Sequence, residues 1–173
     1  MSIALADPLS FLLITEGTKV FEKIYEGSTE QAALVNQQMF VMGKKPGFAL
    51  AAQLCKDNTD GDTEDIGSFL SKKLCQVAFG VRPGYKKAGQ RSFILTFSAQ
   101  QNTQFACFGL NIQPQSQRQL DYFNAYASFY AGVLTGAAAH FGQRANVTYS
   151  LQGDVAFNIE LQEFSGPWEF ASM

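Results

Sequence analysis

The feature that most constrains the fold is a change in the spacing of apolar residues at about residue 93. Before about residue 80 the apolar residues recur at helical spacing, whereas beyond residue 93 they alternate with polar residues in two separate regions. Strict alternation is typical of strands that bury one face. A helical stretch from about Ser116 to Phe141 separates the two alternating regions. The pattern therefore predicts helices packed against one face of a sheet.

The two alternating regions each predict a hairpin. In the first, a strand at Phe93–Phe97 is followed by one at Ala106–Ile112. In the second, Val147–Leu151 and Val155–Leu161 flank Gly153 and Asp154. The predicted fold class is α+β, with a helical hairpin and further helices packed on one four-stranded antiparallel sheet.

Three helical regions precede the strands. The first runs from Pro8, a favoured first-turn residue, to Gly27, a favoured helix end. The second starts at Thr29, and we expect Gly43–Pro46 to interrupt it before helical spacing resumes. The third presents a clean apolar face from Ile66 until Gly80 stops it.

The first helix is apolar over an unusually wide arc. On a helical wheel its apolar residues form two neighbouring stripes, which are Leu9, Leu13, Val20 and Ile24 in one and Phe11, Ile14, Phe21 and Tyr25 in the other. Together they cover about half the circumference, whereas roughly 100° is enough to cover the core of one domain. The excess indicates either a partner chain on this helix or a second helix that covers both stripes.

Length and charge limit the function classes. With 173 residues the chain is expected to form one domain, assigned to residues 1–164, with a short tail at 165–173. Its 13 basic and 15 acidic residues are scattered, so no basic surface for nucleic acid is expected.

The residues needed for catalysis or metal binding are sparse. His140 is the only histidine, and the three cysteines, Cys55, Cys75 and Cys107, lack metal-ligand spacing. The acidic segment Asp57–Asp65 fails the register of a calcium-binding loop. No nucleophile, zinc-protease or phosphate-loop motif is present. We therefore expect a protein that is not an enzyme, with no catalytic residue, cofactor or metal.

The sequence also predicts a cytoplasmic chain. The N-terminus lacks a cationic region before its short apolar run. The stretch 120–141 contains polar residues, and its apolar run is much shorter than the ~20 residues that a membrane span needs.

Gly132 and Gly136 lie in the long helix with the spacing that lets another backbone approach closely. The approaching element would be a sheet or a second helix. Because this helix lies between the two predicted hairpins, we expect both glycines to pack it on the sheet.

Four stretches and their order resemble a known family. They are VNQQMFVMGKKPGFALAAQLC (Val35 to Cys55), DIGSFLSKKLCQVAFG (Asp65 to Gly80), YASFYAGVLTGAAAHFG (Tyr126 to Gly142) and ANVTYSLQGDVAFNIELQEF (Ala145 to Phe164). Over residues 8–164 the chain resembles the small subunits of TRAPP, the transport protein particle complex that tethers vesicles. The likeness is specific in element order and in two glycine patterns, but none of its residues is a chemical signature.

The resemblance implies a function in a complex. Small subunits of this family pair through their first two helices, and the pairs assemble with paralogous subunits. The assembled surface promotes nucleotide exchange on a Rab-type GTPase in traffic between the endoplasmic reticulum and the Golgi, with only peripheral membrane contact. The first helix would then contact a paralogous small subunit.

The resemblance also bears on acylation. One branch of the family carries an acyl chain on a cysteine at a position that aligns near Gly61–Thr63, where this chain has no cysteine. Cys55, six residues away, is the remaining candidate for acylation. We therefore expect a non-acylated branch.

A second function class stays open. Small-molecule sensor domains of the vinyl-reductase-like type share the fold, and 16 Phe and 6 Tyr residues could line a ligand cavity. The same rings could instead fill a solid core.

Overall fold

The computed structural model describes residues 8–56, 65–98, 116–152 and 154–163, with the side chains of all these residues except 8–13 and 151–152. The elements in chain order are α1 (Pro8–Ile24), α2 (Gln31–Lys56), α3 (Ile66–Phe69), the π-helical turn η1 (Leu70–Leu74), α4 (Cys75–Ala78), β1 (Gly84–Lys87), β2 (Ser92–Phe97), α6 (Gln117–His140), β3 (Gln143–Gln152) and β4 (Asp154–Glu163).

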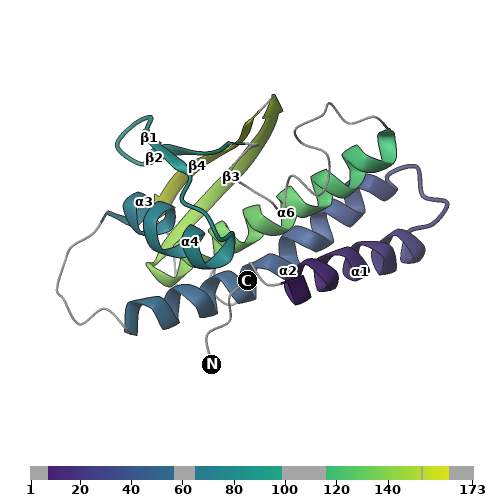
Figure 1. Ribbon diagram of the computed structural model, residues 1–173, viewed down its shortest axis with the longest axis horizontal. Coiled ribbons are helices and arrows are strands. Elements are labelled where there is room, and N and C mark those ends of the chain that lie inside the picture. The colour runs from purple at the N-terminus through teal and green to yellow at the C-terminus, as the bar shows by residue number, and fades with distance from the viewer. Residues whose placement is uncertain (1–7, 57–64, 99–115, 153, 164–173) are drawn as a thin grey trace.

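The strands form one four-stranded antiparallel sheet in the order β1-β2-β4-β3. Helix α6 packs against β3, and α2 packs against α6 on the side away from the sheet (Figure 1). Helix α1 lies along α2. The predicted α+β class, with helices on a four-stranded antiparallel sheet, is confirmed.

The second predicted hairpin is confirmed, whereas the first is wrong in its pairing. Strands β3 and β4 pair with Val147 opposite Ile159. Strand β2 has β4 on one edge and β1 on the other, so its hairpin partner is β1 rather than Ala106–Ile112, which lies outside the described residues. Alternation did not reveal β1 because all four residues of Gly84–Lys87 are exposed.

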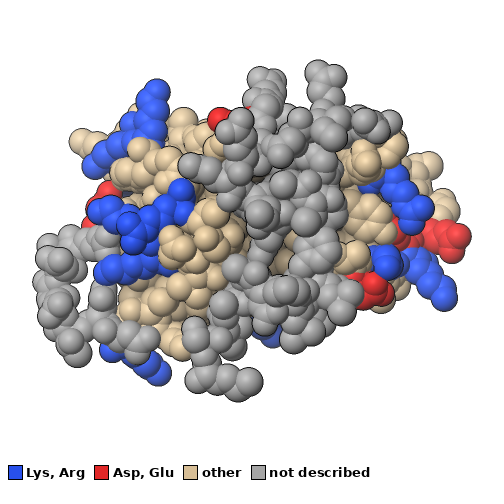
Figure 2. Space-filling model, viewed as in Figure 1, with Lys and Arg blue, Asp and Glu red and all other residues tan. Residues whose placement is uncertain are grey.

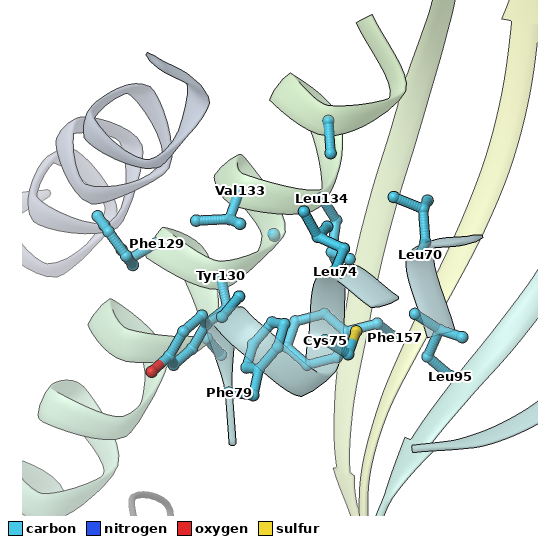
Figure 3. Packing of buried hydrophobic residues seen from close by; sticks show 14 of the residues in the cluster. Leu70, Leu74, Cys75, Phe79, Leu95, Phe129, Tyr130, Val133, Leu134 and Phe157 are labelled. Atoms are coloured by element: carbon cyan, nitrogen blue, oxygen red, sulfur yellow. The ribbon is translucent and has the colours of Figure 1, made fainter. Parts of the chain in front are cut away.

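The inward sides of β2 and β4 form the core with the helices. Phe79, which follows α4, has its ring centroid 4.1 Å from that of Tyr130 on α6 and 4.9 Å from that of Phe97 on β2. Phe157 on β4 closes the group, with its ring centroid 5.7 Å from that of Phe97. Figure 3 shows Phe157 beside Phe79 and Tyr130. These rings are at most 2% exposed. They pack against one another and fill the space between the helices and the sheet.

Helix α2 differs from the prediction because it is continuous. The expected interruption at Gly43–Pro46 is absent, and Pro46 lies inside a helix of 26 residues. An internal proline loses a backbone hydrogen bond and costs about 3 kcal/mol or more in helix propensity. The helix continues because one side of it is packed in the core both before and after Pro46, at Met39, Gly43, Gly47 and Leu50.

The third predicted helix is one helical segment with a π-helical turn at its centre. The turn places Leu70 and Leu74 in full burial, and the segment ends before Gly80, whose φ is 75°. The predicted stop at Gly80 is confirmed.

The glycines of α6 meet a helix, not the sheet. The expectation that Gly132 and Gly136 pack α6 on the sheet is wrong. A Cβ added at Gly132 would overlap the carbonyl oxygen of Phe40, and one at Gly136 would overlap that of Lys44, both on α2. The sheet side of α6 carries side chains instead, including Ser128, whose Oγ lies 3.1 Å from the Tyr149 hydroxyl of β3.

Two glycines of α2 complete this contact. A Cβ at Gly43 would overlap the carbonyl oxygen of Phe129, and one at Gly47 would overlap that of Val133. The Cα of Gly132 lies 3.1 Å from where a Cβ on Gly43 would stand. The Cα of Gly43 likewise lies 3.1 Å from where a Cβ on Gly132 would stand. The two helices therefore touch backbone to backbone at four glycines, which we call the glycine crossing.

Replacing Gly136 with Ala should destabilise the fold. Alanine gains about 1 kcal/mol in helix propensity. The new methyl group, however, would stand 2.7 Å from the carbonyl carbon of Lys44, where backbone must move, and overpacking typically costs about 1 to 3 kcal/mol. Urea unfolding of dilute protein should show a lower midpoint for Gly136→Ala.

Gly17→Ala is the matched control for this experiment. Among the described residues, a Cβ at Gly17 meets only the end of Met42, at 3.6 Å. Its midpoint should be equal to or above that of the wild type. A Gly136→Ala protein more stable than the wild type would refute the crossing as the reason for this glycine.

Candidate partner interface

One apolar stripe of α1 packs against the protein's own core. Ile14 is buried, and Phe21 and Tyr25 are partly buried against the same cluster. Thr18 is also buried on this side, where its hydroxyl donates a hydrogen bond of 2.9 Å to the carbonyl oxygen of Ile14 and lies 3.7 Å from the sulfur of Met39 on α2. This stripe fixes which way α1 is turned on α2.

In the other stripe of α1, the two side chains that the structure describes are exposed. Val20 is 55% and Ile24 is 62% exposed. Helix α2 adds Val41 at 48%, Met42 at 42% and Phe48 at 40%. We call these five residues the α1–α2 patch. The two helices of the patch approach each other at Gly17 and Met42. There, the methyl carbon of Met42 lies 3.6 Å from where a Cβ on Gly17 would stand.

The eight interface residues expected on α1 therefore separate into three groups. Val20 and Ile24 belong to the patch. Ile14 is wrong as an interface residue because it is only 3% exposed, and Phe21 and Tyr25 contribute mainly to the core. The side chains of Leu9, Phe11 and Leu13 lie outside the described residues.

Sequence reasoning missed the contribution of α2. None of Val41, Met42 and Phe48 is among the interface residues expected from the sequence. Because Gly43 and Gly47 face α6, residues on the opposite side of α2 are directed away from the fold. The glycine spacing was visible in the sequence, and together with the identity of its partner helix it would have identified this face.

Charged groups border the patch on α1. The Nζ of Lys19 donates a hydrogen bond of 2.6 Å to the carboxylate of Glu16, which raises the pKa of the lysine. Both side chains are about half exposed, so the pair adds little to stability. Elsewhere, Lys and Arg side chains gather at the end of the molecule that carries β1, where Arg82, Lys86 and Lys87 are exposed (Figure 2).

His140 is explained by packing. It lies in the last turn of α6, where a basic residue is favoured, and is only partly exposed. Its ring meets the edges of Phe48 at 5.4 Å and Phe141 at 5.2 Å. No polar group that would orient it for catalysis is among these contacts.

The cysteines differ in accessibility. Cys75 is fully buried, and burial raises the pKa of its thiol well above its usual value. Cys55 near the end of α2 is partly exposed, and burial raises the pKa of its thiol although Lys73 opposes the shift. Cys107 lies outside the described residues. A raised pKa lowers the thiolate fraction at neutral pH, so neither described thiol is activated as a nucleophile.

Two absences concern only the part of the chain that the structure describes. There, no group of three or more His, Cys, Asp or Glu side chains is placed to hold a metal ion. None of the helices in the same ranges is long and apolar enough to cross a bilayer.

Comparison with solved structures supports the fold. The crystal structure of a trafficking protein particle complex subunit 3 from Naegleria fowleri, covalently bound to palmitic acid, is similar with a TM-score of 0.65. The alignment has 15% sequence identity and covers 90% of this chain and 96% of that one. At this identity the likeness shows a shared fold.

Comparison with protein families is more specific. No curated protein matches the sequence significantly. The family described as transport protein particle (TRAPP) component matches residues 20–162, which run from the last turn of α1 through nearly all of β4. The chain therefore belongs to the TRAPP component family.

Proposed function

We propose that this chain pairs with paralogous TRAPP small subunits through the α1–α2 patch. In this proposal the assembled complex, rather than the single subunit, promotes nucleotide exchange on a Rab-type GTPase in traffic between the endoplasmic reticulum and the Golgi. The chain acts in the cytoplasm, with peripheral contact at those membranes. Membership of the family makes it a component of a vesicle-trafficking complex, and the pairing and exchange functions go beyond that membership.

The observation that carries the pairing is the exposure of five large apolar side chains on two adjacent helices. Val20 and Ile24 are each more than half exposed on a helix that already buries its other stripe. Large apolar side chains exposed together on neighbouring elements are typical of sites of protein association. A partner that covers the patch would remove these side chains from water, which favours association.

The ligand-sensor alternative receives less support. It requires aromatic side chains around a cavity, whereas Phe79, Phe97, Tyr130 and Phe157 contact one another. Among the described residues, a hollow of about 220 Å³ lies on the outer face of the sheet, where polar side chains such as Asn146 contribute to its lining. Family membership also favours the trafficking complex.

Replacing Val20 or Ile24 with Glu should prevent pairing without unfolding the chain. Both side chains are exposed in the single chain, but a buried, unpaired carboxylate in an interface should cost several kcal/mol of association. Tagged wild-type protein purified from native cytosol should retain paralogous TRAPP subunits, identified by mass spectrometry, and both variants should lose them.

Thr148→Glu is the matched control for these variants. It adds the same charge at an exposed position on the outer face of the sheet and should retain the subunits. Far-ultraviolet circular dichroism should show the wild-type fold for all three variants. Retention of the subunits by both Val20→Glu and Ile24→Glu would contradict the proposed interface.

His140→Gln should leave exchange activity of the assembled complex unchanged. The His140 ring packs by its edges against Phe48 and Phe141, and a glutamine side chain fills similar space. The measurement is release of fluorescent nucleotide from the GTPase by complexes containing either form. Loss of exchange in a fully assembled variant complex would identify His140 as a functional residue.

The chain should carry no acyl group when made in eukaryotic cells. Cys55 is the described cysteine nearest to the acylated position of the related branch, and its raised pKa disfavours the reactive thiolate. Intact mass should equal that of the unmodified polypeptide apart from N-terminal processing. A mass increase of one fatty acyl group that disappears in Cys55→Ser would reverse this conclusion.

A further inference from the structure

Strand β1 is an edge of the sheet, and in the described part of the chain one side of its backbone has no neighbouring strand. Its neighbour on the other side is β2. Directly after β1, the N–H of Ala88 donates a hydrogen bond of 2.9 Å to the carbonyl oxygen of Ser92. Because hydrogen-bonded and non-hydrogen-bonded pairs alternate along an antiparallel ladder, the N–H and C=O groups of Tyr85 and Lys87 are directed away from β2. Strand β1 therefore offers backbone donors and acceptors to a further strand.

The edge is already fixed in the single chain. The hydroxyl of Tyr85 donates a hydrogen bond of 3.1 Å to the carboxylate of Asp65, directly before α3. The ring of Tyr85 also packs on that of Phe93, with 5.7 Å between the centroids. Gly67 leaves room for the Tyr85 ring, since a Cβ on Gly67 would stand 2.8 Å from it. An edge that is ordered in advance loses little conformational freedom when it binds a partner.

Basic side chains lie on both faces of the sheet at this edge. Lys86 is opposite Ile94 and extends from the outer face. Lys87 is opposite the buried Phe93 and extends from the face toward the helices. Both lysines and Arg82 are exposed, and within the described ranges no ion pair neutralises any of the three (Figure 2). The edge is therefore positively charged above and below the plane of the sheet.

We propose that β1 binds an extended acidic segment of a partner protein as an additional strand of the sheet. The backbone of this segment pairs with Tyr85 and Lys87 at the ordinary distance of about 4.8 Å between strands. Two consecutive acidic residues of the segment lie opposite Lys86 and Lys87. One carboxylate is then on each face, because neighbouring side chains of a strand alternate between the faces. These two contacts fix the register of the segment.

The charges and the geometry favour this occupant over two others. A second copy of the chain would bring the lysines of two β1 edges together, and like charges on paired strands are destabilising. A flat membrane surface would meet the lysine on one face of the sheet and miss the lysine on the other. It would also leave the backbone groups of the edge without a ladder of partners. An acidic strand satisfies both the backbone and the charges.

This surface is separate from the α1–α2 patch and goes beyond the proposed function. Helix α2 packs on the side of α6 away from the sheet, and α1 lies along α2, so β1 and the patch belong to different layers (Figure 1). A chain that is paired with a paralogous subunit can bind the acidic segment at the same time. Either proposal can therefore fail while the other stands.

The first test measures binding of a peptide to the purified full-length chain by fluorescence anisotropy. The probe is a fluorescein-labelled hexapeptide of threonine and valine with two consecutive glutamates at its centre. It should bind with a dissociation constant below about 100 μM, whereas the same peptide with lysines in place of the glutamates should not bind. Absence of binding by the glutamate peptide would overturn the proposal. Binding of the chain to phosphatidylserine vesicles but not to this peptide would assign the edge to a membrane instead.

The second test uses two N-methylated forms of the glutamate peptide, which separate strand addition from attraction between charges alone. Methyl groups on alternate amides remove the donors from one side of an extended peptide and leave those on the other side. Because only one side faces β1, one form should lose affinity at least about tenfold and the other should stay within about twofold of the unmodified peptide. Equal affinities of the two forms, at whatever level, would refute strand addition.

The third test changes the lysines of the edge. Lys86→Glu and Lys87→Glu should each raise the dissociation constant of the glutamate peptide about tenfold, because a carboxylate then lies opposite a carboxylate. Lys23→Glu, at an exposed lysine on α1, makes the same change in net charge. This control should keep the affinity within about twofold of wild type, since distant exposed charges are screened. Equal affinities of both β1 variants and the control would show that the peptide binds elsewhere.

Discussion

The fold depends on direct contact between the backbones of α2 and α6. At the glycine crossing no side chain separates the helices, because Gly43, Gly47, Gly132 and Gly136 each face a carbonyl oxygen of the other helix. Helix α6 is then held between two layers, with α2 on one side and β3 on the other. Ser128 and the backbone of Asn124 meet the Tyr149 hydroxyl on the sheet side. The orientation of α2 follows from the crossing, and so does the surface that α2 presents to solvent.

The sequence predicted which segments form helices and strands better than it predicted which of these elements contact one another. Alternation from Val147 to Leu161 identified the β3–β4 hairpin because buried and exposed faces alternate strictly there. The same rule failed for β1, where all four residues are exposed and pairing is made by backbone groups that carry no sequence signal. Pro46 predicted a break in α2 from local propensity, and burial of the core-facing side of the helix on both sides of Pro46 outweighed that propensity.

The candidate interface shows the same limit. The wheel of α1 revealed two apolar stripes, but a single sequence does not determine which stripe a neighbouring helix covers. The structure places Ile14 inside and Val20 outside, and this separation depends on how α1 is turned on α2. Likewise, the spacing of Gly132 and Gly136 indicated close approach without naming what approaches. Both answers required tertiary contacts between residues far apart in the chain.

The way α1 is attached has a thermodynamic consequence. Among its described side chains, helix α1 contributes one stripe to its own core, and the helix is joined to the domain mainly through α2. Anything that binds the folded helix but not the detached one stabilises the attachment by mass action. A subunit that covers the exposed stripe would therefore also hold α1 in place. Local opening of this helix and dissociation of the partner are then two coupled equilibria, and protection of α1 amides from hydrogen exchange would rise with partner concentration.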